Sequence, residues 1–203
     1  MKRYSFSSIF TEAFRDNLGW EKAWTKRQPK KEYQIIIVGG GGHGLATAYY
    51  LAKNFNIKDI AVIEKGWIGG GNTGRNTTII RSNYLQESSI GIYEKSRFLY
   101  ETLSQDLNYN IMFSPRGVLM LCQTEHELRA MKRTSHANRI NGVDTKMVTP
   151  AEVKEIVPII NIDGPRFPVL GALWQPRGGT ARHDAVAWGY ARKCSDYGID
   201  IIE

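Results

Sequence analysis

The glycine cluster at residues 39–44 constrains the fold of this chain more than any other feature. Gly39, Gly41 and Gly44 follow the spacing G-x-G-x-x-G between a β-branched apolar run at 35–38 and a segment of small and apolar residues at 46–52. The first glycine permits a tight turn, the second lets the backbone approach a pyrophosphate, and the third lets a helix pack closely on a strand. We therefore expect a strand, a turn and a helix whose N-terminus directs N–H groups at a phosphate.

A second apolar run at residues 60–64 completes a βαβ unit over residues 34–65. The run ends at Glu64, which lies 20 residues beyond Gly44. A carboxylate at this place accepts hydrogen bonds from ribose hydroxyls, which argues against a ribose 2′-phosphate. The crossover is expected to be right-handed, and the strand at 35–38 is expected to be buried on both faces.

A second glycine-rich segment at residues 66–84 favours FAD over NAD. It offers many hydrogen-bond donors and little side-chain bulk, which suits wrapping an extended flavin dinucleotide, whereas the alternative is a flexible surface loop. The residues expected to hold the cofactor are Gly39, Gly41, Gly42, Gly44, Glu64, Lys65, Gly71, Asn72, Thr73, Gly74, Arg75, Asn76 and Thr77.

The rest of the chain alternates between helix and strand patterns. Helices are expected at residues 88–107, 124–141, 149–158 and 184–196, and strands within 113–123, 169–176 and 199–203. Helix-capping signals are Thr124 with Glu127, Pro150 after Thr149, and Asp184. The apolar stripe expected on the helix at 88–107 consists of Ile92, Leu99, Leu103 and Leu107.

These patterns predict an α/β fold. The expected architecture is a Rossmann-like FAD/NAD(P)-binding domain of the glutathione-reductase type with part of an α+β substrate domain, together spanning residues 34–203. A strand at 199–203 that returns to the nucleotide-binding sheet suggests that the domain is incomplete at its C-terminus.

Residues 1–33 form an aromatic and basic arm. Large apolar side chains recur at roughly helical spacing there, and residues 25–33 resemble a polar linker. The arm either folds onto its own domain or docks on another subunit, because exposed apolar patches mark interaction sites.

Composition excludes several other classes of protein. The net charge of +7 is spread along the chain, without a nucleic-acid-binding motif. No apolar run has the length of a membrane span, and no signal peptide is evident. Cys122 and Cys194 are expected to be reduced thiols of a cytoplasmic protein. His126 and His136 lack metal-pair spacing, and no metal site is expected.

Two stretches carry a resemblance to a known family. The first extends from IIIVGGGGHG through GGGNTGRNTTIIRSNY, and the second is RGGTARHDAVAWGYAR. With these motifs the chain resembles the N-terminal half of the β-subunit family of heterotetrameric sarcosine oxidases, within the FAD-dependent amine oxidoreductases. The glycine motif is common to many flavoproteins, whereas the other two stretches are much more specific.

The resemblance implies noncovalent FAD that oxidises sarcosine by taking a hydride equivalent from its N-methyl carbon. The imine product is trapped by tetrahydrofolate or hydrolysed to glycine and formaldehyde. A second flavin, FMN, is bound covalently to a histidine and passes electrons to O2, which releases hydrogen peroxide. The implied partners are α, γ and δ subunits.

The resemblance also implies three site residues. Arg81 matches the arginine that pairs with the substrate carboxylate, although a structural salt bridge is the alternative. Thr78 stands where monomeric relatives carry an arginine. His183 matches the histidine that binds FMN, where a neutral imidazole acts as the nucleophile; from the residues alone, a solvent-exposed histidine at a helix entry is the alternative.

Two rival functions remain open from the sequence. One is another FAD-dependent amine oxidase or dehydrogenase that acts on dimethylglycine or glycine and lacks FMN on His183. The other is a non-catalytic assembly fragment that binds a partner through residues 1–33.

Overall fold

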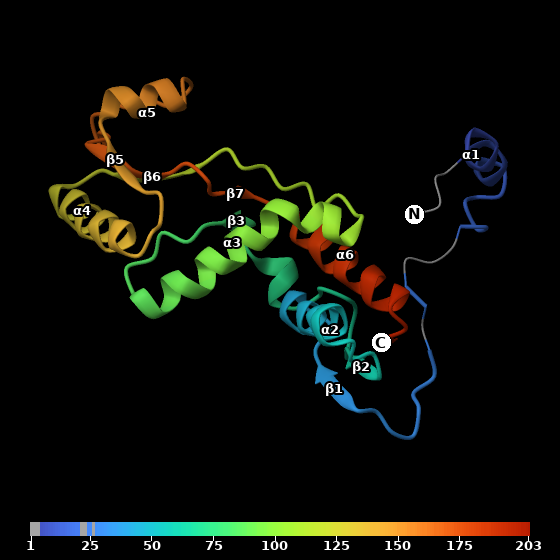
Figure 1. Ribbon diagram of the computed structural model, residues 1–203. Helices are drawn as coiled ribbons and strands as arrows, with labels where there is room; N and C mark the ends of the chain where they lie inside the picture. The colour runs from blue at the N-terminus through green and yellow to red at the C-terminus, as the bar shows by residue number, and fades with distance from the viewer. Residues whose placement is uncertain (1–4, 21–23, 26) are drawn as a thin grey trace. The chain divides into compact units, whose positions relative to one another are not determined.

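The computed structural model describes residues 5–20, 24–25 and 27–203 (Figure 1). Two compact units share the chain. Unit 1 comprises Met1–Asn76, Gln105–Ile111 and His183–Glu203, and unit 2 comprises Thr77–Ser104 and Met112–Arg182.

Unit 1 is built on a three-stranded parallel sheet of order β1-β2-β8. The strands are β1 (Ile35–Val38), β2 (Ile60–Ile63) and β8 (Asp200–Ile202), and Val62 of β2 aligns with Ile37 on one side and Ile201 on the other. Helix α2 (Gly42–Phe55) connects β1 to β2, and α6 (His183–Asp196) leads into β8. The βαβ unit and the returning strand are confirmed.

Small side chains let α2 and α6 pack side by side (Figure 1). Alanines occupy much of the buried surface of both helices, so their backbones approach closely. The buried residues of these helices are Leu45, Ala48, Tyr49 and Ala52 in α2, and Ala185, Val186, Ala187, Gly189, Tyr190, Ala191 and Cys194 in α6.

The expectation that β1 is buried on both faces is wrong for the described chain. Ile36 is 55% exposed and Val38 is 86% exposed, whereas Ile35 and Ile37 are partly buried. The alternation arises because β1 pairs only with β2 among the described strands, and because Ile37 lies on the face toward Gly44 of α2.

Unit 2 contains an antiparallel sheet of order β4-β6-β5. Its strands are β4 (Val118–Cys122), β6 (Gly171–Gln175) and β5 (Lys146–Val148), the last of which the sequence patterns did not indicate. Helices α4 (Glu125–Ile140) and α5 (Pro150–Ile156) pack against β6 (Figure 1). Val148, Val153, Val169 and Ala172 form a core cluster of this unit.

Helix starts in unit 2 follow the local sequence signals. Thr124 and Glu127 form the expected capping box at the start of α4. Thr149 and Glu152 form a second capping box before α5, with Pro150 as its first residue. Each box satisfies two backbone N–H groups that a helix start leaves without partners.

Two further strands bring distant segments of unit 2 together. β3 (Ile79–Ile80) pairs antiparallel with β7 (Gly179–Thr180), with Ile79 opposite Thr180 and Ile80 opposite Gly179. These segments belong to the two specific stretches of the sequence, TTIIR and RGGTAR, whose pairing was not expected.

Two helix details differ from expectation. In α3 (Glu87–Leu107), Ile92 is 72% exposed and does not belong to the buried stripe, whereas Ile90 is buried, because the helical repeat aligns Ile90 with the buried Arg97 seven residues later. Helix α6 begins at His183 rather than at 184, so Asp184 lies inside the first turn and accepts the N–H of Ala185 at 2.8 Å instead of acting as the N-cap.

The described part of the arm contains α1 (Phe6–Ala13), followed by a turn. Residues 1–4, 21–23 and 26 of the arm lie outside the described residues. No helix in the described ranges is both long and apolar enough to cross a membrane.

Candidate functional site

A pocket of about 580 Å³ lies at the carboxyl ends of β1 and β2. The glycine turn, the residues that follow β2 and the second glycine-rich segment surround it. Its lining consists of Val38, Gly39, Gly41, Gly42, His43, Gly44, Glu64, Lys65, Gly66, Trp67, Gly70, Gly71, Asn72, Thr73 and Arg75.

The glycine turn brings backbone close to backbone. Gly39 has φ +112°, and a Cβ on Gly44 would collide with the carbonyl oxygen of Gly39. Gly41 is the N-cap of α2, and no protein acceptor among the described residues meets the N–H groups of His43 and Gly44. A helix N-terminus with free donors attracts an anion.

The second glycine-rich segment is fastened to the first. The N–H of Gly42 donates to Oγ1 of Thr73 at 2.9 Å, and the N–H of Gly69 donates to the carbonyl of Gly40 at 3.0 Å. The short 3₁₀ helix η1 (Asn72–Arg75) packs against α6. The second glycine-rich segment is therefore held in place by these hydrogen bonds and by the contact of η1 with α6, and it is not a loose surface loop.

Glu64 closes the end of the glycine turn with its carboxylate. Oε2 accepts the N–H of Gly40 at 2.8 Å, and Oε1 accepts the N–H of Gly66 at 2.9 Å. These backbone donors hold the pKa of Glu64 below its usual range. Each carboxylate oxygen has a further lone pair for a ligand hydroxyl.

In unit 2, Arg81 presents a guanidinium that is positioned by its neighbours. Its NH1 donates to Oδ1 of Asn83 at 2.8 Å, and its Cζ lies 4.3 Å from the ring centroid of Tyr84. Tyr84 stacks in turn on Tyr93 at 4.2 Å. No carboxylate within the described ranges pairs with Arg81, so the structural salt bridge considered from the sequence is not formed there.

Thr78 has an unusual backbone conformation. Its φ is +62°, a left-handed value that β-branched residues rarely adopt. The carbonyl of Thr78 accepts the N–H of Ala181 at 3.1 Å, which continues the pairing of β3 with β7. Strained residues of this kind cluster at functional sites.

His183 is the first residue of α6, in unit 1. Its Nδ1 is buried and has no hydrogen-bond partner among the described residues. Since α6 packs against both α2 and η1, the imidazole belongs to the same unit as the glycine pocket.

Comparison with known proteins decides the family. The family described as FAD dependent oxidoreductase (DAO) matches residues 34–203. The chain belongs to this family. Among solved structures of similar fold, the L-proline dehydrogenase of P. horikoshii has a TM-score of 0.79 at 32% identity, over 86% of this chain and 45% of that one.

Two relatives that share one name align over nearly the whole chain. Sarcosine oxidase subunit beta of Rhodobacter capsulatus is 66% identical over 203 residues, which is 100% of this chain and 49% of the relative. The protein of that name from Rhizobium meliloti is 53% identical over 201 residues, 99% of this chain and 48% of the relative. This FAD-dependent chain therefore spans about half the length of these relatives.

A more distant relative aligns over fewer residues of this chain. Human mitochondrial sarcosine dehydrogenase is 23% identical over 170 residues, which is 83% of this chain and 18% of that protein. The matched length equals the 170 residues of the family domain at 34–203.

The pocket in unit 1 has the chemistry that FAD requires. Free N–H groups at the start of α2 suit a pyrophosphate, and the Glu64 carboxylate suits a ribose. A Cβ on Gly41 would lie 3.0 Å from Oγ1 of Thr73, so a side chain at this position would require Thr73 to shift.

Most residues expected to bind FAD line this pocket, and some do not. Gly74, Asn76 and Thr77 are absent from its lining. The sequence reasoning missed five lining residues, Val38, His43, Gly66, Gly70 and Trp67, of which Trp67 is 69% exposed. Their positions within or beside the two glycine segments are the signal that would have identified them.

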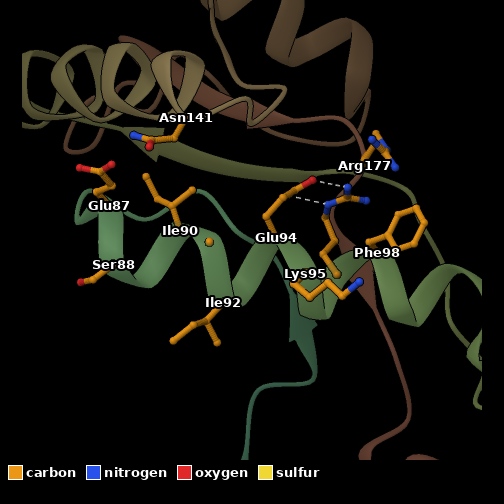
Figure 2. Close-up of a pocket in the computed structure, with 11 residues that line it drawn as sticks. Glu87, Ser88, Ile90, Ile92, Glu94, Lys95, Phe98, Asn141 and Arg177 are labelled. Carbon is orange, nitrogen blue, oxygen red and sulfur yellow. Dashed lines mark hydrogen bonds and ion pairs between the residues drawn. The ribbon is translucent and has the colours of Figure 1, made fainter. Parts of the chain in front are cut away.

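Unit 2 has an open pocket of its own, of about 850 Å³, along the first half of α3 (Figure 2). Glu87, Ile90 and Glu94 of α3 line it, with Asn141 and Arg177 across from them. Arg97, which also lines the pocket, is almost fully buried and forms ion pairs with Glu94 and with Glu101, the latter at 2.6 Å. These charges satisfy one another, which indicates a structural role.

No metal centre is evident in residues 5–20, 24–25 and 27–203. No three His, Cys, Asp or Glu side chains of these ranges are grouped so as to hold a metal ion.

Proposed function

We propose that this chain is the FAD-binding part of the β subunit of a sarcosine oxidase, an enzyme that demethylates sarcosine oxidatively to glycine. The observation that carries the proposal is the 66% identity to a sarcosine oxidase subunit beta over all 203 residues. The pocket in unit 1 supports it, because its donors and its carboxylate match the parts of a flavin dinucleotide.

Within this pocket, the first turn of α2 would hold the pyrophosphate through the N–H groups of His43 and Gly44. Glu64 would accept the hydrogen bonds of a ribose, and Lys65 and Arg75 supply positive charge at the rim. The remaining contacts are assigned to Gly39, Gly41, Gly42, Gly71, Asn72, Thr73, Gly74, Asn76 and Thr77. Bound FAD would supply the acceptor for the hydride equivalent that leaves the N-methyl carbon.

Arg81 is proposed to bind the carboxylate of sarcosine. Its guanidinium has no carboxylate partner among the described residues, and a planar fork of donors matches a carboxylate in a bidentate way. Asn83 and Tyr84 act as positioning residues, because they fix one edge and one face of the guanidinium. The strained backbone at Thr78, three residues earlier, supports a role for this segment in the site.

His183 is proposed to carry a covalently attached FMN. Its Nδ1 has no hydrogen-bond partner among the described residues and could form a bond to the methyl carbon of the flavin. That carbon would lose a proton, the two electrons would stay on the flavin, and O2 would reoxidise it. The attached flavin would relay electrons from FAD to O2 and so account for hydrogen peroxide as a product.

The proposed partners are α, γ and δ subunits, with tetrahydrofolate as an acceptor for the one-carbon unit that is otherwise released as formaldehyde. The cytoplasm is the proposed location, supported by two buried free thiols, Cys122 and Cys194.

A comparison of substrates tests the proposed activity in the complete enzyme, co-expressed with the subunits encoded beside it. We expect sarcosine to give a kcat/KM well above that of dimethylglycine or glycine. A higher kcat/KM for dimethylglycine or glycine would assign the enzyme to that amine. If none of the three amines is turned over, the chain would be a non-catalytic assembly fragment.

The FMN assignment has a separate test. After acid denaturation, flavin absorbance should stay on the tryptic peptide that contains His183, and His183→Asn should remove that absorbance while the acid-released FAD is unchanged. Flavin that appears only in the supernatant of the wild-type enzyme would contradict the assignment.

A further inference from the structure

The described part of the arm carries five large apolar side chains that are exposed. We call Phe6, Ile9, Phe10, Phe14 and Leu18 the arm stripe; they are 85%, 53%, 59%, 78% and 86% exposed. Exposed apolar groups in such density mark a surface that another molecule covers.

The arm stripe is presented by locally formed structure. Oγ of Ser5 accepts the N–H of Ser8 at 3.1 Å and caps α1. The ring of Phe10 lies 6.4 Å from that of Phe6 and 5.0 Å from that of Phe14. Aromatic side chains at i, i+4 and i+8 are the anchors with which an amphipathic helix enters a groove.

The last part of the arm, residues 27–33, is held to the rest of unit 1 by side-chain contacts, whereas the arm stripe is exposed. Tyr33 donates its hydroxyl to Oδ2 of the buried Asp200 at 2.9 Å, and NH1 of Arg27 lies 3.3 Å from Oδ1 of the same carboxylate. Nζ of Lys30 lies 2.8 Å from Oδ1 of Asp59. Side-chain contacts therefore hold the linker to the rest of unit 1. In contrast, none of the described residues of α1 is buried.

The comparisons separate the arm from the family fold. The FAD dependent oxidoreductase family begins at residue 34, and the match to human sarcosine dehydrogenase has only the length of that domain. The relatives from Rhodobacter capsulatus and Rhizobium meliloti match over 203 and 201 residues and so include the arm, whereas the Arthrobacter relative of the same name matches over 184 residues. The arm therefore lies outside the family domain and is shared with two proteins that are named as one subunit of an enzyme.

We propose that the arm stripe docks into an apolar groove on a different subunit of the same enzyme. The inference rests on the proposed function, because it takes the chain to be one subunit of several. Phe6, Phe10 and Phe14 are the anchors, and the fixed linker sets the point from which α1 reaches its partner.

The test uses the complete β subunit co-expressed with the other subunits. The arm variant combines Phe6→Ser, Phe10→Ser and Phe14→Ser. Its matched control combines Phe55→Ser, Ile140→Ser and Ile159→Ser, three largely exposed apolar side chains (69%, 86% and 94%) that lie outside the arm. Native mass spectrometry measures assembly, and the FAD content and thermal midpoint of the complete β subunit are measured in parallel.

We expect the arm variant to assemble with about 100-fold lower affinity, since buried aromatic anchors dominate interfaces. The control should assemble like the wild type, and both should keep their FAD and their thermal midpoint. Full assembly of the arm variant would overturn the proposal. A lowered midpoint of the β subunit alone would place the arm on its own chain, and loss of a β-subunit homodimer would place it on a second copy; either result also overturns it.

The assembly result is independent of substrate. If the wild-type complex forms through the arm but does not oxidise sarcosine, the proposed function fails and the docking surface stands. If the complex oxidises sarcosine and the arm variant still assembles, the docking surface fails alone.

Discussion

At the scale of single residues, Glu64 shows how one carboxylate organises a binding pocket. It accepts two backbone N–H groups from either side of the pocket, which keeps it ionised. Because its pKa is lower in the folded chain than in the unfolded chain, its contribution to stability is complete above the unfolded-state pKa of about 4.3. That contribution is lost as the pH falls through the pKa of the folded state.

The substitution Glu64→Gln tests this role. The amide NH₂ would face the N–H of Gly40 or Gly66, so two donors would meet where a carboxylate now accepts. We expect about tenfold weaker FAD binding, since a hydrogen bond to a charged group is lost and a donor is left without an acceptor. Fluorescence titration of the complete subunit with FAD measures the FAD affinity, and the substitution of the exposed Glu155, Glu155→Gln, is the control. Unchanged affinity in E64Q would contradict a role for this carboxylate in the pocket.

Arg81 is the second residue with a specific expected effect. Arg81→Met keeps the length and apolar stem but removes the guanidinium that we assign to the substrate carboxylate. We expect kcat/KM for sarcosine to fall by about 100-fold or more, because a charge-assisted pair is worth about 2–5 kcal/mol. Steady-state kinetics of the assembled enzyme measures the change, and the exposed Arg129→Met should leave it unaltered. Wild-type kinetics in R81M would exclude this arginine from substrate binding.

At the scale of secondary-structure elements, the contact between α2 and the turn after β1 depends on the absence of a side chain. A Cβ on Gly44 would collide with the carbonyl oxygen of Gly39. Gly44→Ala should therefore push the helix away, at a cost of about 2 kcal/mol in unfolding free energy and with loss of FAD affinity.

The control is Gly91→Ala in α3, where an added Cβ meets nothing within 4 Å. There, the alanine should stabilise the helix by about 0.5–1 kcal/mol because it loses less backbone entropy than glycine. Denaturant unfolding of both variants measures the contrast. Equal stabilities would mean that α2 does not depend on the close approach at Gly44.

Helix α3 depends on a buried charge. Arg97 is 1% exposed and lies between Glu94 and Glu101, and the ion pair with Arg97 keeps the pKa of Glu94 below its usual range. Arg97→Met should cost about 3 kcal/mol, because two carboxylates lose their partner. Thermal unfolding tests it against the exposed Lys95→Met on the same helix, which should change stability by less than about 0.5 kcal/mol. A similar small loss in both would show that the cluster contributes little.

Elements with strong local signals were predictable from the sequence. The turn at Gly39, Gly41 and Gly44, the capping box at Thr124, the helix start at Pro150 and the returning strand at 200–202 all follow from neighbouring residues. Such signals act within a few positions of the chain, so no knowledge of the tertiary structure is needed to interpret them.

Other features depend on contacts between distant segments. The pairing of Ile79 and Ile80 with Gly179 and Thr180 involves two residues on each side, too few for a recognisable pattern. The burial of Arg97 in place of an apolar residue requires two carboxylates on the same helix, which a search for an apolar stripe overlooks. The exposure of Val38 depends on which strands and helices surround β1, which its own sequence does not specify.

At the scale of the whole molecule, the chain forms two compact units, and each is assembled from stretches that are separated in the sequence. Unit 1 gathers the glycine pocket and His183 from residues more than 100 positions apart, whereas unit 2 contains Thr78 and Arg81. The cofactor pocket and the arginine assigned to the substrate therefore lie in different units.

Anaerobic mixing of the assembled enzyme with sarcosine shows whether the bound flavin accepts electrons from this amine. We expect the absorbance of the bound flavin to be lost within a single turnover, Arg81→Met to slow this loss by about 100-fold, and air to restore the absorbance. Flavin that stays oxidised in the presence of saturating sarcosine would rule out the proposed oxidation of sarcosine, and reduction by dimethylglycine or glycine instead would assign the same pocket to a different amine.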